Sequence, residues 1–183
     1  PVGAPGAGAG WVDRTAVMEP GCALAVELMR GDFAAAAIGT CTYVDGSRVH
    51  GFGHEFQTLG ETLLPMSVAY IYTVVASSEI SFKLGGPLTP AGSVTQDRPS
   101  GITGYLDRPA PMVPFDVRMH NPVTKREESF HFEITQNTSL FQRLLIGAVQ
   151  DCFTRAEATL GPNTKRYVIT VDLEGLEPWS YED

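Results

Sequence analysis

A histidine set among glycines is the first residue of this chain that could do chemistry. His54 lies close to Gly51, Gly53 and Gly60 and is followed by an acid, Glu55. Glycine permits close backbone approach and positive φ, and both conditions often bring a side chain to the edge of a site. An imidazole placed there can act as a general base. The alternative interpretation is a hydrogen-bonded histidine of the core.

An aspartate and a serine further along the chain could complete a catalytic group with His54. Asp97 and Ser100 follow it in the order histidine, aspartate, serine that one large class of serine peptidases uses. Gly101, directly after the serine, would let backbone N–H groups point at an oxyanion. However, an acid three residues before the nucleophile does not readily reach round the imidazole to bind its far nitrogen. Ser100 is therefore either a nucleophile or part of a tight turn, and the turn is favoured.

The sequence supports a metal or cofactor site less than it supports a catalytic role for His54. The possible metal ligands are His50, His54, Glu55, His120 and His131. In a strand, His50 and His54 would share a face but lie about 13 Å apart, which is too far for one ion. His131 alternates with Phe130 and Phe132, which predicts that it faces solvent while the phenylalanines face the core. We predict no metal site and, because the chain has no phosphate-binding glycine motif, no cofactor.

The composition excludes several classes of partner. The chain has 183 residues, a net charge of −8 and an isoelectric point near 4.9. So acidic a chain is poorly suited to nucleic acid or anionic membranes, where phosphates must be neutralised. No stretch approaches the roughly 18 apolar residues that a membrane-spanning helix needs. The acids leave one cation option open, Ca²⁺ bound by Asp32, Asp97 and the acidic C-terminal tail.

The cysteines carry little information about chemistry. Cys22, Cys41 and Cys152 are too few and too scattered for a disulfide framework, and their odd number leaves at least one unpaired. Their apolar neighbours indicate small buried side chains.

Short runs rich in β-branched and aromatic residues recur along the chain, separated by turn signals, and this spacing predicts a barrel or sandwich. The runs are 36–44, 48–52, 68–76, 79–84, 93–96, 112–119, 129–135 and 166–173. A type I′ turn at Asp45-Gly46 would join the first two. A two-residue loop there would place Val44 opposite Ser47 and Cys41 opposite His50.

One long amphipathic helix is predicted over about 139–160. Apolar residues recur there at helical spacing, residues 136–139 offer N-caps, and Gly161-Pro162 ends the pattern. The glycine- and proline-rich residues 1–10 are expected to form a flexible arm, and residues 11–183 a single domain. Trp179 and Tyr181, set among acids, could dock on another domain or subunit or belong to a frayed tail.

Six collinear blocks between about residues 20 and 135 resemble the SpoIVB-type serine peptidases, a family that includes many bacterial proteins annotated with that peptidase domain. The blocks are Gly31-Asp32, the segment GTCTYVDG at 39–46, FGH at 52–54, Pro65-Met66, SFKLG at 81–85 and QDRPSGITG at 96–104. Six blocks in order are far more specific than one short motif.

This resemblance implies a trypsin-like β-barrel, an extracytoplasmic location, and His54 as the general base toward a serine nucleophile. The family's nucleophile lies in a G-M-S-G-S-P element near the end of the domain, and this chain has no such element. The family's catalytic aspartate has no identifiable counterpart either. Without an activated serine, a histidine can move protons but cannot form an acyl-enzyme.

We therefore expect a mainly β fold, a trypsin-like β-barrel-derived domain with one long amphipathic helix near the C-terminus. The expected function is that of a peptidase-derived binding or assembly module without catalysis. Its partner would be a protein or peptide, a neighbouring domain of a longer precursor, or a second copy of the chain. The alternative is an active serine endopeptidase that uses His54 with Ser100, or with a serine outside this chain.

Overall fold

The prediction of a mainly β fold is confirmed. The computed structural model describes residues 15–79, 81–121, 124–156, 166, 168–171 and 175–182, which form ten strands and one helix. The flexible arm predicted at residues 1–10 lies outside the described residues. The strands are β1 (Ala23–Gly31), β2 (Ala35–Asp45), β3 (Arg48–Gly51), β4 (Gly60–Val75), β5 (Phe82–Arg98), β6 (Gly101–Tyr105), β7 (Met112–Asn121), β8 (Arg126–Thr135), β9 (Val168–Val171) and β10 (Trp179–Glu182).

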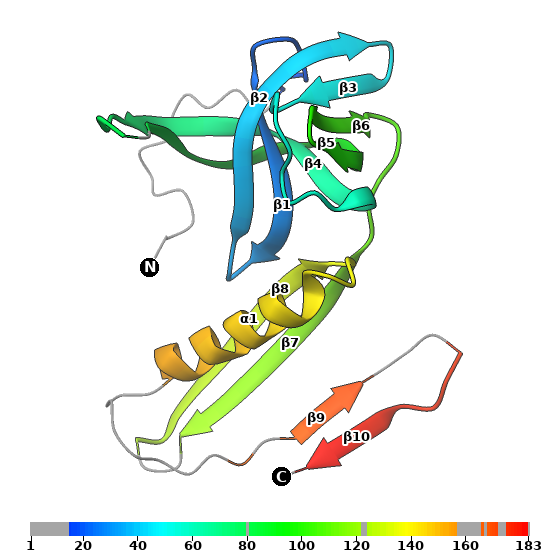
Figure 1. Cartoon of the computed structure of the whole chain (residues 1–183). Coiled ribbons are helices and arrows are strands. Elements are labelled where there is room, and N and C mark those ends of the chain that lie inside the picture. Colours follow the sequence, from blue (N-terminus) through cyan, green and yellow to red (C-terminus); the bar gives the residue numbers. More distant parts are fainter. Residues whose placement is uncertain are drawn as a thin grey trace.

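Eight of these strands form one antiparallel sheet in the order β2-β3-β6-β5-β4-β1-β8-β7. Because β2 pairs with β1 as well as with β3, the sheet curls back on itself into a partial ring (Figure 1). β4 returns to lie beside β1 after three consecutive strands, which is the Greek-key order β4-β1-β2-β3. β9 and β10 form a separate two-stranded sheet.

The ring encloses the first of two hydrophobic clusters. Leu24 and Val26 on β1 lie opposite Val68 and Met66 on β4, and all four side chains are buried. Val94 on β5 joins them in the same cluster. Burial of apolar side chains of this size stabilises the fold by about 1.5–3 kcal/mol each.

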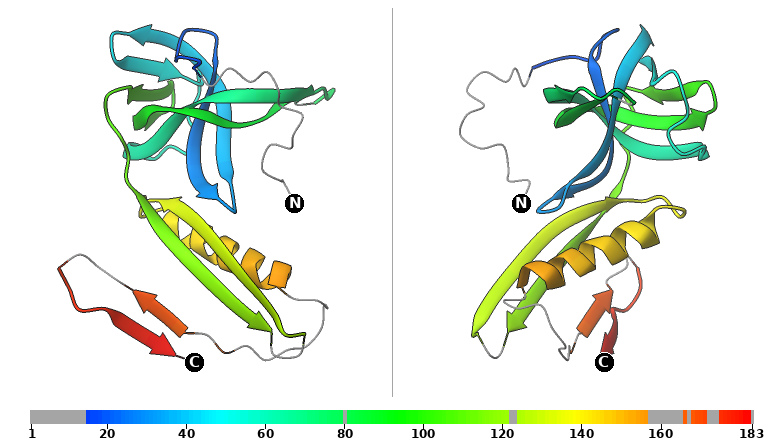
Figure 2. Two further views of the ribbon diagram at one scale, coloured as in Figure 1. Left: turned by 180° about the vertical axis from the view of Figure 1, so that it is seen from behind. Right: turned by 60° about the vertical axis from the view of Figure 1, so that its left-hand side comes forward.

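The second cluster lies between the β7–β8 hairpin and the helix α1 (Phe141–Ala156), which runs along β7 and β8 (Figure 2). Phe132 and Ile134 on β8 contribute fully buried side chains. β8 also pairs with the end of β1, which connects this part of the sheet to the ring. His131 is exposed between the buried Phe130 and Phe132, as their alternation predicts.

The predicted helix is confirmed over residues 141–156, and its predicted end beyond 156 lies outside the described residues. Asn137 is the N-cap. Its side-chain oxygen accepts hydrogen bonds from the backbone N–H groups of Ser139 and Leu140, at 3.1 and 3.2 Å. The 16-residue helix is not of the length and apolarity that a bilayer-spanning segment requires, and no other helix among the described residues is.

The predicted pairing of the first hairpin is wrong by one residue. Asp45 lies opposite Arg48 and Val44 opposite Val49, so Gly46 and Ser47 form the two-residue loop. Gly46 has a φ of 57° and Ser47 does not have a positive φ, which is the pattern of a type II′ turn. Because glycine takes the first loop position, Asp45 remains in the strand. His50 consequently lies opposite Tyr43, and Cys41 lies opposite Gly51.

The outer part of the β4–β5 hairpin extends beyond the ring (Figure 1). β1 pairs with β4 only up to Val68, and β6 pairs with β5 only from Ser93 onward. Residues 69–75 and 82–87 therefore pair only with each other among the described strands. We call these two segments the β4–β5 extension.

Candidate functional site

His54 lies in the connection between β3 and β4, at one end of the ring. Its side chain is exposed and packs at a tilt against the ring of Phe52, with centroids 5.6 Å apart. Its Nδ1 is 2.6 Å from the backbone carbonyl oxygen of Glu55. A carbonyl oxygen can only accept, so Nδ1 donates this hydrogen bond. In the neutral form of the imidazole, Nε2 is then the acceptor nitrogen.

Asp97 holds the connection that carries His54, but through its backbone. The carboxylate is fully buried at the end of β5. Its Oδ1 accepts a hydrogen bond from the N–H of Phe56 at 2.7 Å. Its Oδ2 accepts from the N–H groups of Gln57 and Leu59 at 2.8 and 2.9 Å. Both oxygens are thus occupied by the chain itself, and the imidazole of His54 bonds to Glu55 instead.

Ser100 is exposed in the turn that joins β5 to β6. The next residue, Gly101, lies close to the start of the connection between β3 and β4. A Cβ added there would lie 2.9 Å from the carbonyl oxygen of Gly51 and 3.5 Å from the nitrogen of Gly53. The fold therefore brings the segments of His54, Asp97 and Ser100 to one end of the ring. Within the described residues, no hydrogen bond joins these three side chains.

The other candidate ligands of the sequence are dispersed. His50 Nδ1 lies 3.1 Å from the hydroxyl of Thr103 on β6, and His120 Nδ1 lies 3.5 Å from a carboxylate oxygen of Glu127. Asp32, considered with Asp97 for Ca²⁺, accepts a hydrogen bond at 2.7 Å from the backbone N–H of His131. Each of these polar groups is engaged locally.

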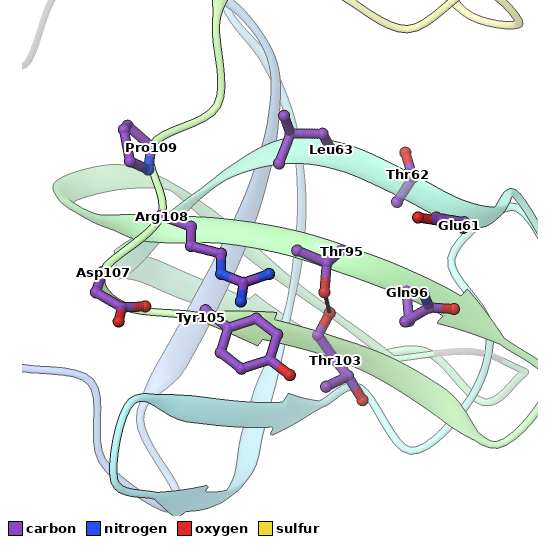
Figure 3. Close-up of a pocket in the computed structure, with 10 residues that line it drawn as sticks. All are labelled: Glu61, Thr62, Leu63, Thr95, Gln96, Thr103, Tyr105, Asp107, Arg108 and Pro109. Carbon is purple, nitrogen blue, oxygen red and sulfur yellow. Dashed lines mark hydrogen bonds between the residues drawn. The ribbon is translucent and has the colours of Figure 1, made fainter.

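An open hollow of about 650 Å³ crosses the outer surface of β4, β5 and β6 (Figure 3). The guanidinium of Arg108 points into it and lies over the ring of Tyr105, 4.2 Å from the centroid. Sequence reasoning did not find this hollow, because its residues come from three strands and a following loop. They are Glu61, Thr62, Leu63, Thr95, Gln96, Thr103, Tyr105, Asp107, Arg108 and Pro109.

Asp116 and His131 form an exposed pair on adjacent strands. The two residues lie opposite each other on β7 and β8, with Nδ1 of the histidine 2.9 Å from Oδ1 of the aspartate. The hydrogen bond to Asp116 raises the pKa of His131 above its ordinary value, desolvation opposes this, and the charges of Asp116, Glu133 and Asp32 add to the increase. Protonated His131 is therefore favoured in the folded chain.

Titration of His131 should show this increase. Because the folded-state pKa lies above 6.5, the ordinary value, the contribution of this group to stability is complete below about pH 6.5 and is lost as pH rises through the folded-state pKa. We expect NMR titration of the His131 ring to give a pKa above 6.5, and Asp116→Asn to lower it toward that value. Asp107→Asn, a change in an exposed carboxylate elsewhere, should leave it unaltered.

The β4–β5 extension carries an exposed apolar face. Residues opposite each other in antiparallel strands share a face, and Val75 lies opposite Phe82 and Tyr70 opposite Gly86. Phe82, Leu84 and Gly86 alternate along β5, so they share this face too. The hydroxyl of Tyr72 lies 3.1 Å from the position that a Cβ on Gly86 would occupy. We define the apolar face as Tyr70, Tyr72, Val75, Phe82 and Leu84.

These five side chains point away from the ring. Lys83, on the opposite face of β5, donates a hydrogen bond to the hydroxyl of Thr40 on β2 at 2.7 Å. That face is therefore turned toward β2 and the apolar face away from it. Tyr72 is 55% exposed and Phe82 is 53% exposed. From sequence alone, Tyr70, Tyr72 and Phe82 are predicted to lie in the core, because they sit at strand alternation. They are exposed instead, because β1 and β6 end before they reach this part of the hairpin.

Comparisons with known proteins yield no relative. No family model, no curated protein and no solved structure matches the chain. The function must therefore be argued from the geometry of these surfaces.

Proposed function

We propose that this chain is a peptidase-derived domain that binds a partner protein and does not itself cleave it. The observation that carries the proposal is the apolar face of the β4–β5 extension. Five apolar or aromatic side chains are exposed there on one side of a hairpin that projects from the ring. Contiguous exposed apolar surface of this kind is typical of sites of protein–protein contact.

The scaffold of this domain is, in this proposal, a trypsin-like β-barrel related to the SpoIVB-type serine peptidases. The six collinear blocks between about residues 20 and 135 support that origin. The partial ring and its Greek-key order are compatible with it. His54 would then be the retained imidazole of the ancestral site.

Two features of the site support a role without catalysis. A histidine base in a serine peptidase needs an acid on its Nδ1–H and a serine hydroxyl at its Nε2. Here the Nδ1–H of His54 is bonded to the carbonyl of Glu55, and the carboxylate of Asp97 is taken up by three backbone N–H groups. The chain also has no G-M-S-G-S-P element.

The partner is expected to present an extended apolar segment. Both outer edges of the β4–β5 extension lack a neighbouring strand among the described residues, so their backbone groups can pair with an added strand. Apolar side chains at alternate positions of that strand would lie on the same side as the apolar face and contact its outermost side chains. The pairing would supply affinity, and the side chains would supply specificity.

A selection of random peptides displayed on phage tests this proposal. Against the intact chain we expect enrichment of segments with apolar residues at alternate positions. Tyr72→Glu or Phe82→Glu should weaken the binding of those peptides by at least about tenfold, because each places a charge in the apolar contact. Ile146→Glu, at a half-exposed position on α1, is the matched control and should bind as the unchanged chain does.

The proposal fails if no peptide is enriched, or if the enriched peptides bind Tyr72→Glu and Phe82→Glu undiminished. Circular dichroism of each variant separates loss of binding from loss of folding. The non-catalytic part of the proposal is overturned separately, if a fluorophosphonate probe labels a serine of the intact chain.

A serine endopeptidase is the second candidate, and one observation favours it. Gly101, which directly follows Ser100, packs against Gly51 and Gly53, directly before His54, whose Nε2 is the acceptor nitrogen in the neutral imidazole. Labelling by the fluorophosphonate probe that disappears in both Ser100→Ala and His54→Ala would establish this candidate. Absence of labelling would overturn this candidate.

A further inference from the structure

Two cysteines face each other where β1 and β2 begin to pair. Ala23 lies opposite Thr40, which is the last regular pair, and Cys22 and Cys41 are the residues directly beyond that pair. The backbone N–H of Cys41 donates a hydrogen bond to the carbonyl oxygen of Cys22 at 2.9 Å. The carbonyl oxygen of Cys41 accepts from the N–H of Gly21 at 2.8 Å, so Gly21 and Cys22 together lie opposite Cys41, as in a β-bulge. Opposed residues of antiparallel strands have Cα atoms about 4.5–5.5 Å apart, within the range of about 4.4–6.8 Å that a disulfide spans.

Both thiols point toward the same hydrophobic cluster. Opposed residues of an antiparallel pair share a face, and Cys41 belongs to the cluster inside the ring while Cys22 packs against it. Burial raises the pKa of the Cys41 thiol to about 11, and the nearby thiol of Cys22 adds to this increase. The Sγ of Cys22 also lies 3.4 Å from the Sδ of Met18. The two thiols are therefore near neighbours, although both are reduced in this structure.

The third cysteine is placed elsewhere. Cys152 lies on α1 in the second hydrophobic cluster, with Phe130 and Phe132. It belongs to neither β1 nor β2 and is buried. Cys152 therefore serves as an internal reference for the reactivity of the other two thiols.

We propose that Cys22 and Cys41 are a modification site, where a low-molecular-weight disulfide such as glutathione disulfide oxidises them to a cross-strand disulfide. Such oxidation needs an oxidising compartment, as outside the cytoplasm. The bond would tie residue 22, directly before β1, to β2. It closes the chain between them into a loop and restricts the unfolded state.

The exchange proceeds in two steps. The half-buried Cys22 is the thiol that solvent reaches, so its thiolate attacks one sulfur of glutathione disulfide and releases one glutathione thiolate. Cys41 then loses its proton to solvent, and its thiolate attacks the Cys22 sulfur and displaces the second glutathione. Two protein thiols are oxidised, and one glutathione disulfide is reduced to two glutathione thiols. Because the pKa of Cys41 is about 11, the second step should become faster as pH rises toward that value.

Counting thiols tests the proposal. The native chain is incubated with glutathione disulfide, and its free thiols are then counted with Ellman's reagent after denaturation. We expect the count to fall from three to one, with a mass lower by two hydrogen atoms and with Cys22 and Cys41 linked in the peptide map. The disulfide should raise the temperature of thermal unfolding, and dithiothreitol should reverse this shift.

Single variants make the assignment specific. Cys152→Ser should still form the disulfide and lose both remaining thiols. Cys41→Ser should instead retain a glutathione adduct on Cys22, since no second thiol can displace it. The proposal is overturned if three thiols remain in the native chain at pH 9 while a reference dithiol is oxidised. A linkage that contains Cys152 would overturn it as well.

Discussion

Replacing Asp97 with alanine is expected to lower the free energy of unfolding by about 3–5 kcal/mol. The carboxylate is fully buried and accepts hydrogen bonds from three backbone N–H groups, those of Phe56, Gln57 and Leu59. Each buried donor left without an acceptor costs about 1–3 kcal/mol, and partial access of water to the connection keeps the sum below the full value. Urea denaturation followed by circular dichroism measures the change.

Asp107→Ala is the matched control for this variant. Asp107 is exposed, so we expect a change within about 0.5 kcal/mol. Amide hydrogen exchange gives a second readout, since the N–H groups of the three donors should exchange faster in Asp97→Ala. Equal effects of the two substitutions, or unchanged exchange at these amides, would show that the carboxylate does not hold the connection that carries His54.

Gly92→Ala should have the other large effect, a loss of more than about 3 kcal/mol of stability or of the folded state altogether. Gly92 lies on β5 with a φ of 134°, a conformation that side chains rarely adopt. A Cβ there would collide with the carbonyl oxygen of Tyr105 and lie 2.8 Å from the Cα of Leu106. Both obstacles are backbone, so the strands themselves would have to separate. Thermal unfolding of the soluble protein measures the loss.

Replacing Gly147 with alanine should change the stability in the opposite direction. Gly147 lies inside α1, is exposed, and has no neighbouring atom within 4 Å of an added Cβ. Alanine favours the helical state over glycine by about 1 kcal/mol, so Gly147→Ala should stabilise the chain. A Gly92→Ala variant as stable as the unchanged chain would contradict the assignment of Gly92 to a close backbone contact.

The sequence predicted those parts of the fold in which the local pattern of apolar and capping residues matches the burial and hydrogen bonding in the structure. The alternation of Phe130, His131 and Phe132 predicted a strand with one buried face, and β8 has that arrangement. The capping residues before Phe141 predicted the start of α1, and Asn137 caps it. In both cases the information lies within a few residues of the element.

Elements that depend on the whole sheet were not predicted. β1 is paired on both sides, and Leu24, Ala25 and Val26 are all fully buried, so no alternation marks it as a strand. β6 contains Gly101 and Gly104, which lower its strand propensity. Its close approach to β5 requires Gly104, because a Cβ there would collide with the carbonyl oxygen of Ser93.

The candidate site was predictable only in part. The glycines around His54 indicated positive φ, and Gly53 and Gly60 have φ values of 77° and 72°. The partners of Asp97 are about 40 residues away along the chain and are backbone groups, which have no sequence signature. The exposure of Tyr72 and Phe82 depends on where β1 and β6 stop pairing with β4 and β5. The lengths of these pairings are set by the sheet as a whole.

In the β4–β5 extension, the exposed surface that could contact a partner is separate from the buried clusters that stabilise the fold. Among the described strands, residues 69–75 and 82–87 pair only with each other, and the buried clusters lie elsewhere. If the extension is the binding surface that we propose, substitutions on its apolar face would alter which segment is recognised while the ring remains intact. In evolution or in design, such a hairpin allows new partners to be acquired on an unchanged scaffold.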